Sequence, residues 1–149
     1  MRGAKTFLIG VLLAAVLMAA LPTTAGAASP REMRRKLISL TNAARRNDGA
    51  RPLDVKWRLS KDAIRHSRRM AERHSVYHTV DLYRHVRPWR PSVWGENVGM
   101  AGTVRRMHRL FMRSSGHRSN ILRRGFSNIG VGVIRRGGRV WATVMFYGG

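Results

Sequence analysis

The chain has 149 residues, with 29 lysines and arginines against seven aspartates and glutamates, a formal net charge of +22 and no cysteine. This length suits a single domain with one core, and the absence of cysteine excludes a fold held by disulfide bonds. The charge predicts attraction to polyanions, such as acidic wall polymers, anionic lipid or, non-specifically, nucleic acid. A GC-rich genome gives the same excess of arginine, so both explanations of the charge stay open.

The first 27 residues have the three-part composition of a secretory signal. Two basic residues precede an uncharged apolar run at 8–21, and small residues then supply an A-x-A cleavage site that ends at Ala27. A retained membrane anchor is the alternative, but the run is short for a span of about 20 residues. We therefore expect a signal at 1–27 and one mature domain at 28–149. That domain would be secreted or held at the cell envelope, with no transmembrane segment after cleavage.

Helical spacing of apolar residues predicts four helices in the mature domain. A serine or threonine that can cap the first turn precedes each of them, and turn-forming residues at 47–49 end the first helix. Arg45 is predicted to lie away from the buried face of the first helix, and His74 on the buried face of the second. The predicted helices, each with its cap, are 30–46 (Ser29), 61–74 (Ser60), 104–113 (Thr103) and 117–122 (Ser115).

Residues 75–102 show no helical period and are predicted to form one long loop. A loop of this length inside a compact domain is usually functional or disordered. Trp89 and Trp94 argue against disorder, because disordered segments contain few aromatic residues. We predict that both tryptophans pack against the domain, with a sugar-stacking surface as the alternative.

The last part of the chain changes to the pattern of β-strands. Two β-rich runs, at 128–136 and 139–147, meet at two consecutive glycines, 137–138, which predicts a hairpin. Gly130 and Gly132 fall on one face of the first run, where a neighbouring backbone or side chain could approach closely. Helices followed by strands predict an α+β fold in which helices cover a sheet.

Five segments stand in a fixed order along the mature chain: LISLTNAARRNDGARPL at 37–53, SVYHT at 75–79, WGENV at 94–98, FMRSSGHRSNIL at 111–122 and FSNIGVGV at 126–133. Together they resemble the CAP superfamily, which comprises cysteine-rich secretory proteins, antigen 5 and plant pathogenesis-related proteins. The sequence is most similar to the short bacterial SCP-like secreted domains. The resemblance implies an α-β-α sandwich with a C-terminal β-hairpin and an open cleft, whose histidines and glutamates can hold a divalent cation, often zinc.

The resemblance also implies roles for individual residues of the cleft. His78 matches the first cleft histidine, Glu96 the glutamate of the GEN motif and His117 the second histidine, while Ser114 stands where eukaryotic members carry a second glutamate. Asn97 completes the predicted cleft residues, and no catalytic residue is assigned. Two imidazoles and one carboxylate can hold Zn²⁺ or another divalent cation with one position left open. Because Ser114 offers no carboxylate at the position of the second glutamate, the case for tight metal binding is weaker.

Glu96 stands in the stretch VWGENVGM at 93–100, framed by Gly95 and Gly99. The glycines are predicted to let the backbone turn sharply and bring the carboxylate to the cleft floor. Asn97 is predicted to bridge to a neighbouring backbone group. From residue types alone, two interpretations of Glu96 stay open: a ligand of the site, or a buried partner of a histidine or arginine that locks the loop.

Three functions follow from these observations. The one we favour is a secreted binding module whose cleft takes a small polar or lipid ligand or a fragment of an envelope polymer, with or without a divalent cation. The second is a metal-assisted hydrolase of the envelope, against which the missing second carboxylate counts. The third is a cationic surface protein that coats polyanions, whose binding would fall steeply with added salt.

Overall fold

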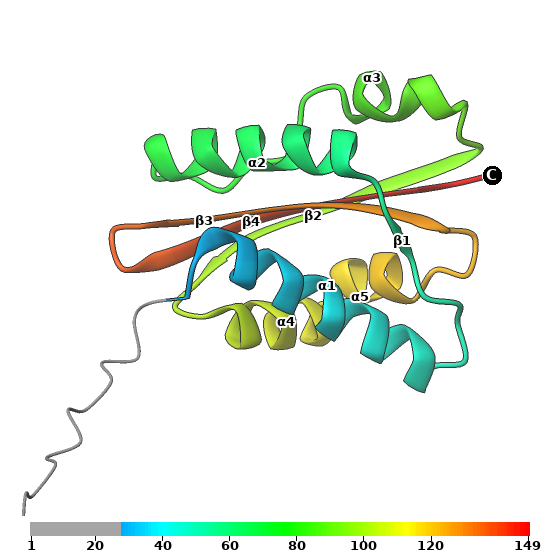
Figure 1. The fold of residues 1–149 in the computed structure, drawn as a ribbon, viewed down its shortest axis with the longest axis horizontal. Helices are drawn as coiled ribbons and strands as arrows, with labels where there is room; N and C mark the ends of the chain where they lie inside the picture. The colour runs from blue at the N-terminus through cyan, green and yellow to red at the C-terminus, as the bar shows by residue number, and fades with distance from the viewer. Residues whose placement is uncertain (1–27) are drawn as a thin grey trace, which may run out of the picture.

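The computed structural model describes residues 28–149, which form three layers with a sheet between two layers of helices (Figure 1). The predicted α+β class and α-β-α sandwich are confirmed, whereas the predicted signal at 1–27 lies outside the described residues. Within the described part, no helix is both long and apolar enough to cross a membrane. The elements are α1 Pro30–Asn47, β1 Asp54–Val55, α2 Trp57–Glu72, α3 Leu82–Val86, η1 Arg87–Trp89, β2 Val93–Ala101, α4 Val104–Arg113, α5 Ser115–Leu122, β3 Asn128–Arg136 and β4 Arg139–Gly148.

The sheet has the strand order β1-β3-β4-β2, so that β2 is an edge strand. β4 pairs antiparallel with both β3 and β2, and the short β1 pairs parallel with β3. Gly137 and Gly138 join β3 to β4 at φ angles of 57° and 69°, which confirms the predicted hairpin turn. Helices α2 and α3 lie over one face of the sheet, and α1, α4 and α5 lie over the other (Figure 1).

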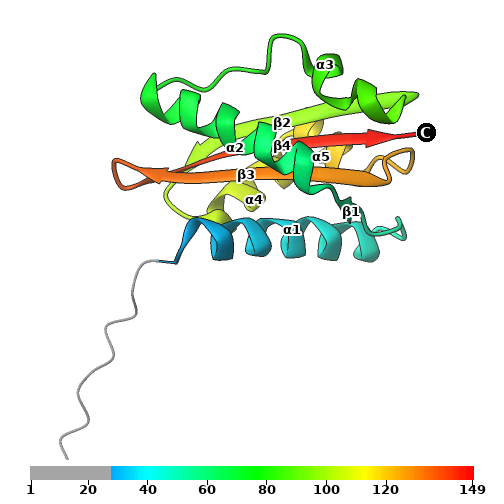
Figure 2. The same ribbon diagram turned by 45° about the horizontal axis from the view of Figure 1, so that its top comes forward.

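Two glycines of β3 bring α2 unusually close to the sheet, along the path that α2 takes over β3 and β4 in Figure 2. A Cβ atom added at Gly130 would lie 2.5 Å from Cγ of Leu59, and one added at Gly132 would overlap the backbone of Ala63. The predicted close approach at these glycines is therefore confirmed, and the approaching element is the α2 backbone.

Two predictions about the second helix are wrong. Ser60 is not its cap, because the helix begins at Trp57 and the Ser60 hydroxyl is buried, where it accepts a hydrogen bond of 3.1 Å from the N–H of Val131. His74 is exposed rather than on the buried face, since α2 ends at Glu72 and His74 adopts a φ of 51° that turns the chain back. A tertiary hydrogen bond therefore determines the position of Ser60, and a turn determines that of His74. Local helix propensity did not predict either position.

The predicted position of Arg45 is also wrong, because its side chain is completely buried. Its guanidinium satisfies carbonyl groups from three separate segments, and burial is the main cause that lowers the pKa of Arg45. These bonds fasten α1 to the end of α5 and to the chain that enters β3. The accepting carbonyls are those of Arg51 at 2.7 Å, Ile121 at 2.8 Å, Arg123 at 2.9 Å and Phe126 at 3.0 Å.

Of the three remaining predicted helix caps, two are confirmed and Ser115 is wrong. Ser29 and Glu32 form a reciprocal capping box at the start of α1, and the Thr103 hydroxyl accepts from the N–H of Arg106 at the start of α4. The fourth predicted helix begins two residues earlier than expected, so Ser115 lies inside α5 and Ser114 is its N-cap residue. Ser114 thus joins α4 directly to α5.

Candidate functional site

The stretch around Glu96 is a strand and not the predicted loop. Residues 75–102 contain α3, η1 and the whole of β2, which pairs with β4 along its full length. Gly95 and Gly99 therefore do not make a sharp turn. They make room for side chains of the helical layer below, since a Cβ at Gly95 would lie 2.9 Å from Oδ1 of Asn120 and one at Gly99 would lie 3.0 Å from Sδ of Met107.

Consecutive side chains of β2 point to opposite faces of the sheet. Asn97 points toward α5, where it is fully buried and its Nδ2 donates to the carbonyl of His117 at 2.9 Å. Asn120 donates to both the Glu96 carbonyl, at 3.1 Å, and Oδ1 of Asn97, at 2.9 Å. The predicted bridge from Asn97 to a backbone group is present, and together the two amides fix α5 against the edge strand.

Glu96 points to the other face, toward the segment that precedes α3, and is only 7% exposed. Its carboxylate accepts three hydrogen bonds: from Nδ1 of His78 at 2.8 Å, from the N–H of Thr79 at 2.9 Å and from the Thr79 hydroxyl at 2.5 Å. The His78 side chain is itself 63% exposed. The buried acid thus holds the segment to the sheet while the imidazole remains open to solvent.

His117 lies near the start of α5, on the helical layer below β2. Its ring is half-buried and packs against Phe111, with the ring centroids 5.0 Å apart. Burial lowers the pKa of His117, and the positive charge of His78 lowers it further. Because Asn97 donates to the carbonyl of His117 while the neighbouring Glu96 accepts from His78, both histidines lie beside the same short stretch of the edge strand.

The structure therefore brings His78, Glu96 and His117 to one region, although only the first two are in contact. Ser114 is half-buried at the junction of α4 and α5, three residues before His117, and makes no side-chain capping bond. Thr79 is a site residue that the sequence analysis missed. Its place beside His78 in the SVYHT segment was the only signal for it.

The arrangement does not fit a three-ligand metal site. Among residues 28–149, no three histidine, aspartate, glutamate or cysteine side chains are grouped so that they could hold a metal ion. The Glu96 oxygens face His78 and Thr79, and three of the four acceptor positions of the carboxylate are already filled. Binding of a divalent cation by His78, Glu96 and His117 stays a prediction, and we derive no chemistry through it.

An exposed aromatic pair lies beside the site. Trp94 is on the same face of β2 as Glu96, two residues away, and its ring lies 4.8 Å from that of Tyr83 on α3. Trp94 is 42% exposed, so it is not the packing residue that was predicted, because an edge strand leaves one flank of its side chains uncovered. Trp89, in contrast, does pack as predicted, stacked on Tyr147 at 5.0 Å.

Replacing Glu96 with glutamine is expected to loosen the segment that carries His78. The amide keeps one acceptor oxygen but turns an NH₂ group toward donors, which should cost about 2 kcal/mol at this buried position. Hydrogen exchange at the Thr79 amide measures the loss directly. Glu72→Gln, at an exposed acid on the last turn of α2, is the matched control and should leave the exchange rate of the Thr79 amide unchanged. Equal exchange at Thr79 in the two variants would show that the Glu96 carboxylate does not hold this segment.

The sandwich, with a buried glutamate and two imidazoles at the sheet edge, defines a domain of the CAP type. The chain belongs to the CAP family of cysteine-rich secretory proteins, whose sequence pattern it matches over residues 38–146. It is 32% identical over 133 residues to the uncharacterized protein YkwD of Bacillus subtilis (strain 168), an alignment that covers 85% of this chain and 51% of that protein. The chain thus spans about half the length of this curated relative.

Solved structures show the same fold. An extracellular protein of Bacillus anthracis that contains an SCP domain superposes with a TM-score of 0.66 at 23% identity, over 83% of this chain and 45% of that one. An outer surface protein of Borrelia burgdorferi superposes with a TM-score of 0.73 at 16% identity, over 81% and 96%. The resemblance drawn from the sequence is therefore confirmed, and the bacterial relatives with these folds are proteins of the cell exterior.

Proposed function

We propose that this CAP domain is secreted and acts at the cell envelope as a binding module, with its ligand held at the open edge of β2. The composition of residues 1–27 supports export, and the relatives described as extracellular or outer surface proteins support the location. The binding groups are the imidazoles of His78 and His117, with the exposed ring of Trp94 beside them.

One observation carries this proposal: a buried acid is used to present an exposed histidine. Glu96 is one of only seven acids in the chain. All three hydrogen bonds of its carboxylate hold the segment of His78 and Thr79 in place. Ordering an exposed imidazole costs side-chain entropy and gives the fold little in return. Such pre-organisation is useful when the imidazole contacts a ligand.

The neighbouring groups indicate the chemistry of the ligand. The imidazoles offer hydrogen-bonding and titratable nitrogens, whereas Trp94 and Tyr83 offer an apolar surface next to them. A molecule with a polar head and an apolar or sugar-like body matches both parts. A small lipid and a fragment of a wall polymer are the two candidates of this kind.

We propose no hydrolytic reaction at this site. A general base must have an oxygen available to take the proton of the attacking water. The Glu96 carboxylate already accepts three hydrogen bonds from the protein, which leaves one of its four acceptor positions open, and Ser114 supplies no second carboxylate. The geometry therefore supports binding better than turnover.

NMR titration of the domain tests the binding function. A lysophospholipid below its micelle concentration and a soluble disaccharide–peptide fragment of peptidoglycan are the two probes. At least one should shift the signals of the Trp94 indole and of both site histidines in the wild type. In the His78→Ala, His117→Ala double variant the indole signal should not shift. His74→Ala is the control, since His74 is exposed and makes no contact with the site residues. Shifts that persist in the double variant, or none with either probe, would refute the proposal.

Zinc titration tests the metal separately. Calorimetry of the wild type and the same double variant compares binding with and without the two imidazoles. Tight binding only in the wild type would support a cation held by His78, Glu96 and His117. Equal and negligible binding in both proteins would show that His78 and His117 do not hold zinc.

A further inference from the structure

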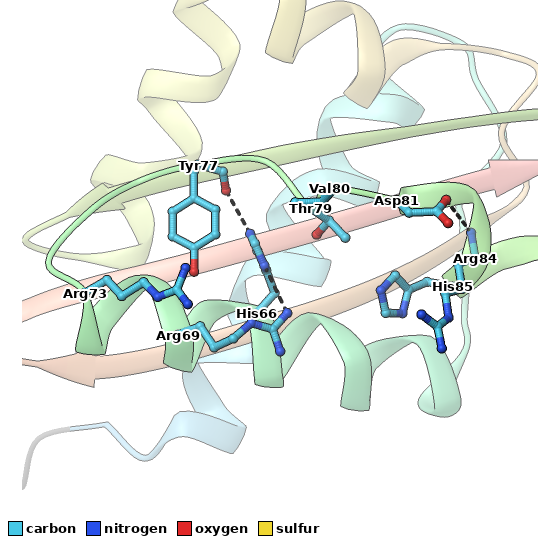
Figure 3. Close-up of a pocket in the computed structure, with 9 residues that line it drawn as sticks. All are labelled: His66, Arg69, Arg73, Tyr77, Thr79, Val80, Asp81, Arg84 and His85. Atoms are coloured by element: carbon cyan, nitrogen blue, oxygen red, sulfur yellow. Dashed lines mark hydrogen bonds between the residues drawn. The ribbon is translucent and has the colours of Figure 1, made fainter.

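A separate pocket, of about 320 Å³, lies between α2 and the chain from residue 77 to residue 85 (Figure 3). Its wall includes Thr79 but not His78, Glu96 or His117, so it opens beyond the segment that Glu96 holds. Its titratable lining besides Tyr77 and the buried His66 is formed by Arg69 from α2, Arg73 directly after α2, Asp81 at the start of α3, and Arg84 and His85 within α3.

The arginines of this pocket lack carboxylate partners. Ion pairs within residues 28–149 join Asp62 to Arg65 and His85, and Glu96 to His78, so that Arg69, Arg73 and Arg84 take part in none. Asp81 is the one acid in the lining, and its Oδ1 accepts from the backbone N–H of Arg84 at 3.1 Å to cap α3. Three guanidinium groups thus border the same space, and the Asp81 carboxylate is the only acid beside them in the lining, so a net positive charge remains.

Tyr77 provides a second, independent observation. Its side chain is among those that line the pocket, and its hydroxyl is buried and has no hydrogen-bond partner in the part of the chain that the structure describes. Figure 3 shows this hydroxyl beside the guanidinium of Arg73, whose Cζ lies 5.6 Å from the ring centroid. A guanidinium donates but cannot accept, and a buried hydroxyl normally has a partner. The group that complements all of them is an acceptor with negative charge.

The wall of the pocket is held in shape by a buried histidine. His66 is almost fully buried on α2, where its Nε2 donates to the Tyr77 carbonyl at 2.8 Å. Its Nδ1 then accepts from Nη2 of Arg69 at 3.3 Å. One side chain therefore fixes both the segment that carries Tyr77 and the direction of an arginine, as in a pre-organised anion site.

We propose that this pocket binds a phosphoryl group. Arginines that approach from α2 and from α3, together with the Tyr77 hydroxyl, suit a tetrahedral anion with several oxygens better than a planar carboxylate with two. The volume is at the lower end of the range for ligand pockets, about 300–1,000 Å³, so a phosphate with a small substituent fits. The group can belong to a small phosphomonoester or to a phosphodiester polymer. This site does not depend on the ligand proposed for the edge of β2.

Calorimetry and NMR at constant ionic strength test the proposal with four probes: inorganic phosphate, glycerol 3-phosphate, a poly(glycerol phosphate) chain and acetate. The wild type should bind the phosphates in preference to acetate, with shifts at Tyr77. The Arg69→Gln, Arg73→Gln variant should bind at least about tenfold more weakly, the factor expected when one charge-assisted hydrogen bond is lost. Tyr77→Phe should also weaken binding, because it removes only the hydroxyl.

The matched control is Arg46→Gln, Arg109→Gln, which removes the same charge from two exposed arginines outside the pocket. It should bind phosphate as the wild type does. A polymer that binds more tightly than glycerol 3-phosphate, and loses that advantage in the pocket variant, would identify the polymer as the source of the group. Equal losses in the two arginine variants, equal binding of acetate and phosphate, or no binding of any phosphate at millimolar concentration would overturn the proposal.

Discussion

Replacing Arg45 with methionine is expected to lower the free energy of unfolding by about 3–5 kcal/mol. Methionine has a similar length but no donor, so the four carbonyls that Arg45 satisfies would remain buried without partners. Those carbonyls belong to the connector after α1, the end of α5 and the approach to β3. The loss should therefore separate α1 from the rest of its layer, and urea denaturation followed by circular dichroism measures it.

Arg46→Met is the matched control for this prediction. Arg46 follows Arg45 in the same helix turn, but its side chain is exposed. A surface substitution of this kind usually changes stability by no more than about 0.5 kcal/mol. Equal effects at the two positions would show that Arg45 does not hold the layer together.

Alanine at Gly132 is the second large effect we expect. The added methyl group would overlap the backbone of Ala63 in α2, and backbone cannot move aside as a flexible side chain can. The helix must lift from β3, which should cost about 3 kcal/mol or more, at the upper end for overpacked cores. Thermal and urea unfolding of Gly132→Ala measure the loss.

The same substitution at Gly116 should increase the stability of the domain instead of lowering it. Gly116 lies in α5, and a Cβ there would meet nothing within 4 Å. Alanine favours a helix over glycine by about 0.5–1 kcal/mol, so this variant should be slightly more stable than the wild type. If Gly132→Ala and Gly116→Ala shifted stability alike, the close contact between α2 and β3 would be refuted.

The parts of the fold that the sequence predicted correctly are those set by local signals. The capping box of α1, the Thr103 cap and the glycine turn of the hairpin each depend on residues within a few positions of one another. β2 was missed because its partner strand β4 lies about 45 residues away, and because glycine and asparagine are poor strand formers. Nothing in the periodicity of 75–102 reveals a partner at that distance.

The sequence proposed candidate site residues but could not predict their hydrogen bonds. The family resemblance pointed to His78, Glu96 and His117. Residue types alone could not show that the Glu96 carboxylate accepts hydrogen bonds from His78 and Thr79. Arg45 shows the same limit. Its spacing of four residues from Thr41 places it on the buried face of α1, but a charged residue is not expected there, and the carbonyl groups that converge on it from distant segments explain its burial.

The central claim is that His78 and His117 share one site across the edge of β2. An NMR titration of the His117 ring in the wild type and in His78→Gln tests it most directly. The positive charge of His78 lowers the pKa of His117, so removing that charge should raise the pKa toward its ordinary value, while burial still holds it below. His74→Gln, which removes an exposed histidine elsewhere, should leave the titration unchanged. An identical pKa of His117 in the wild type and in His78→Gln would place the two imidazoles apart and contradict the account.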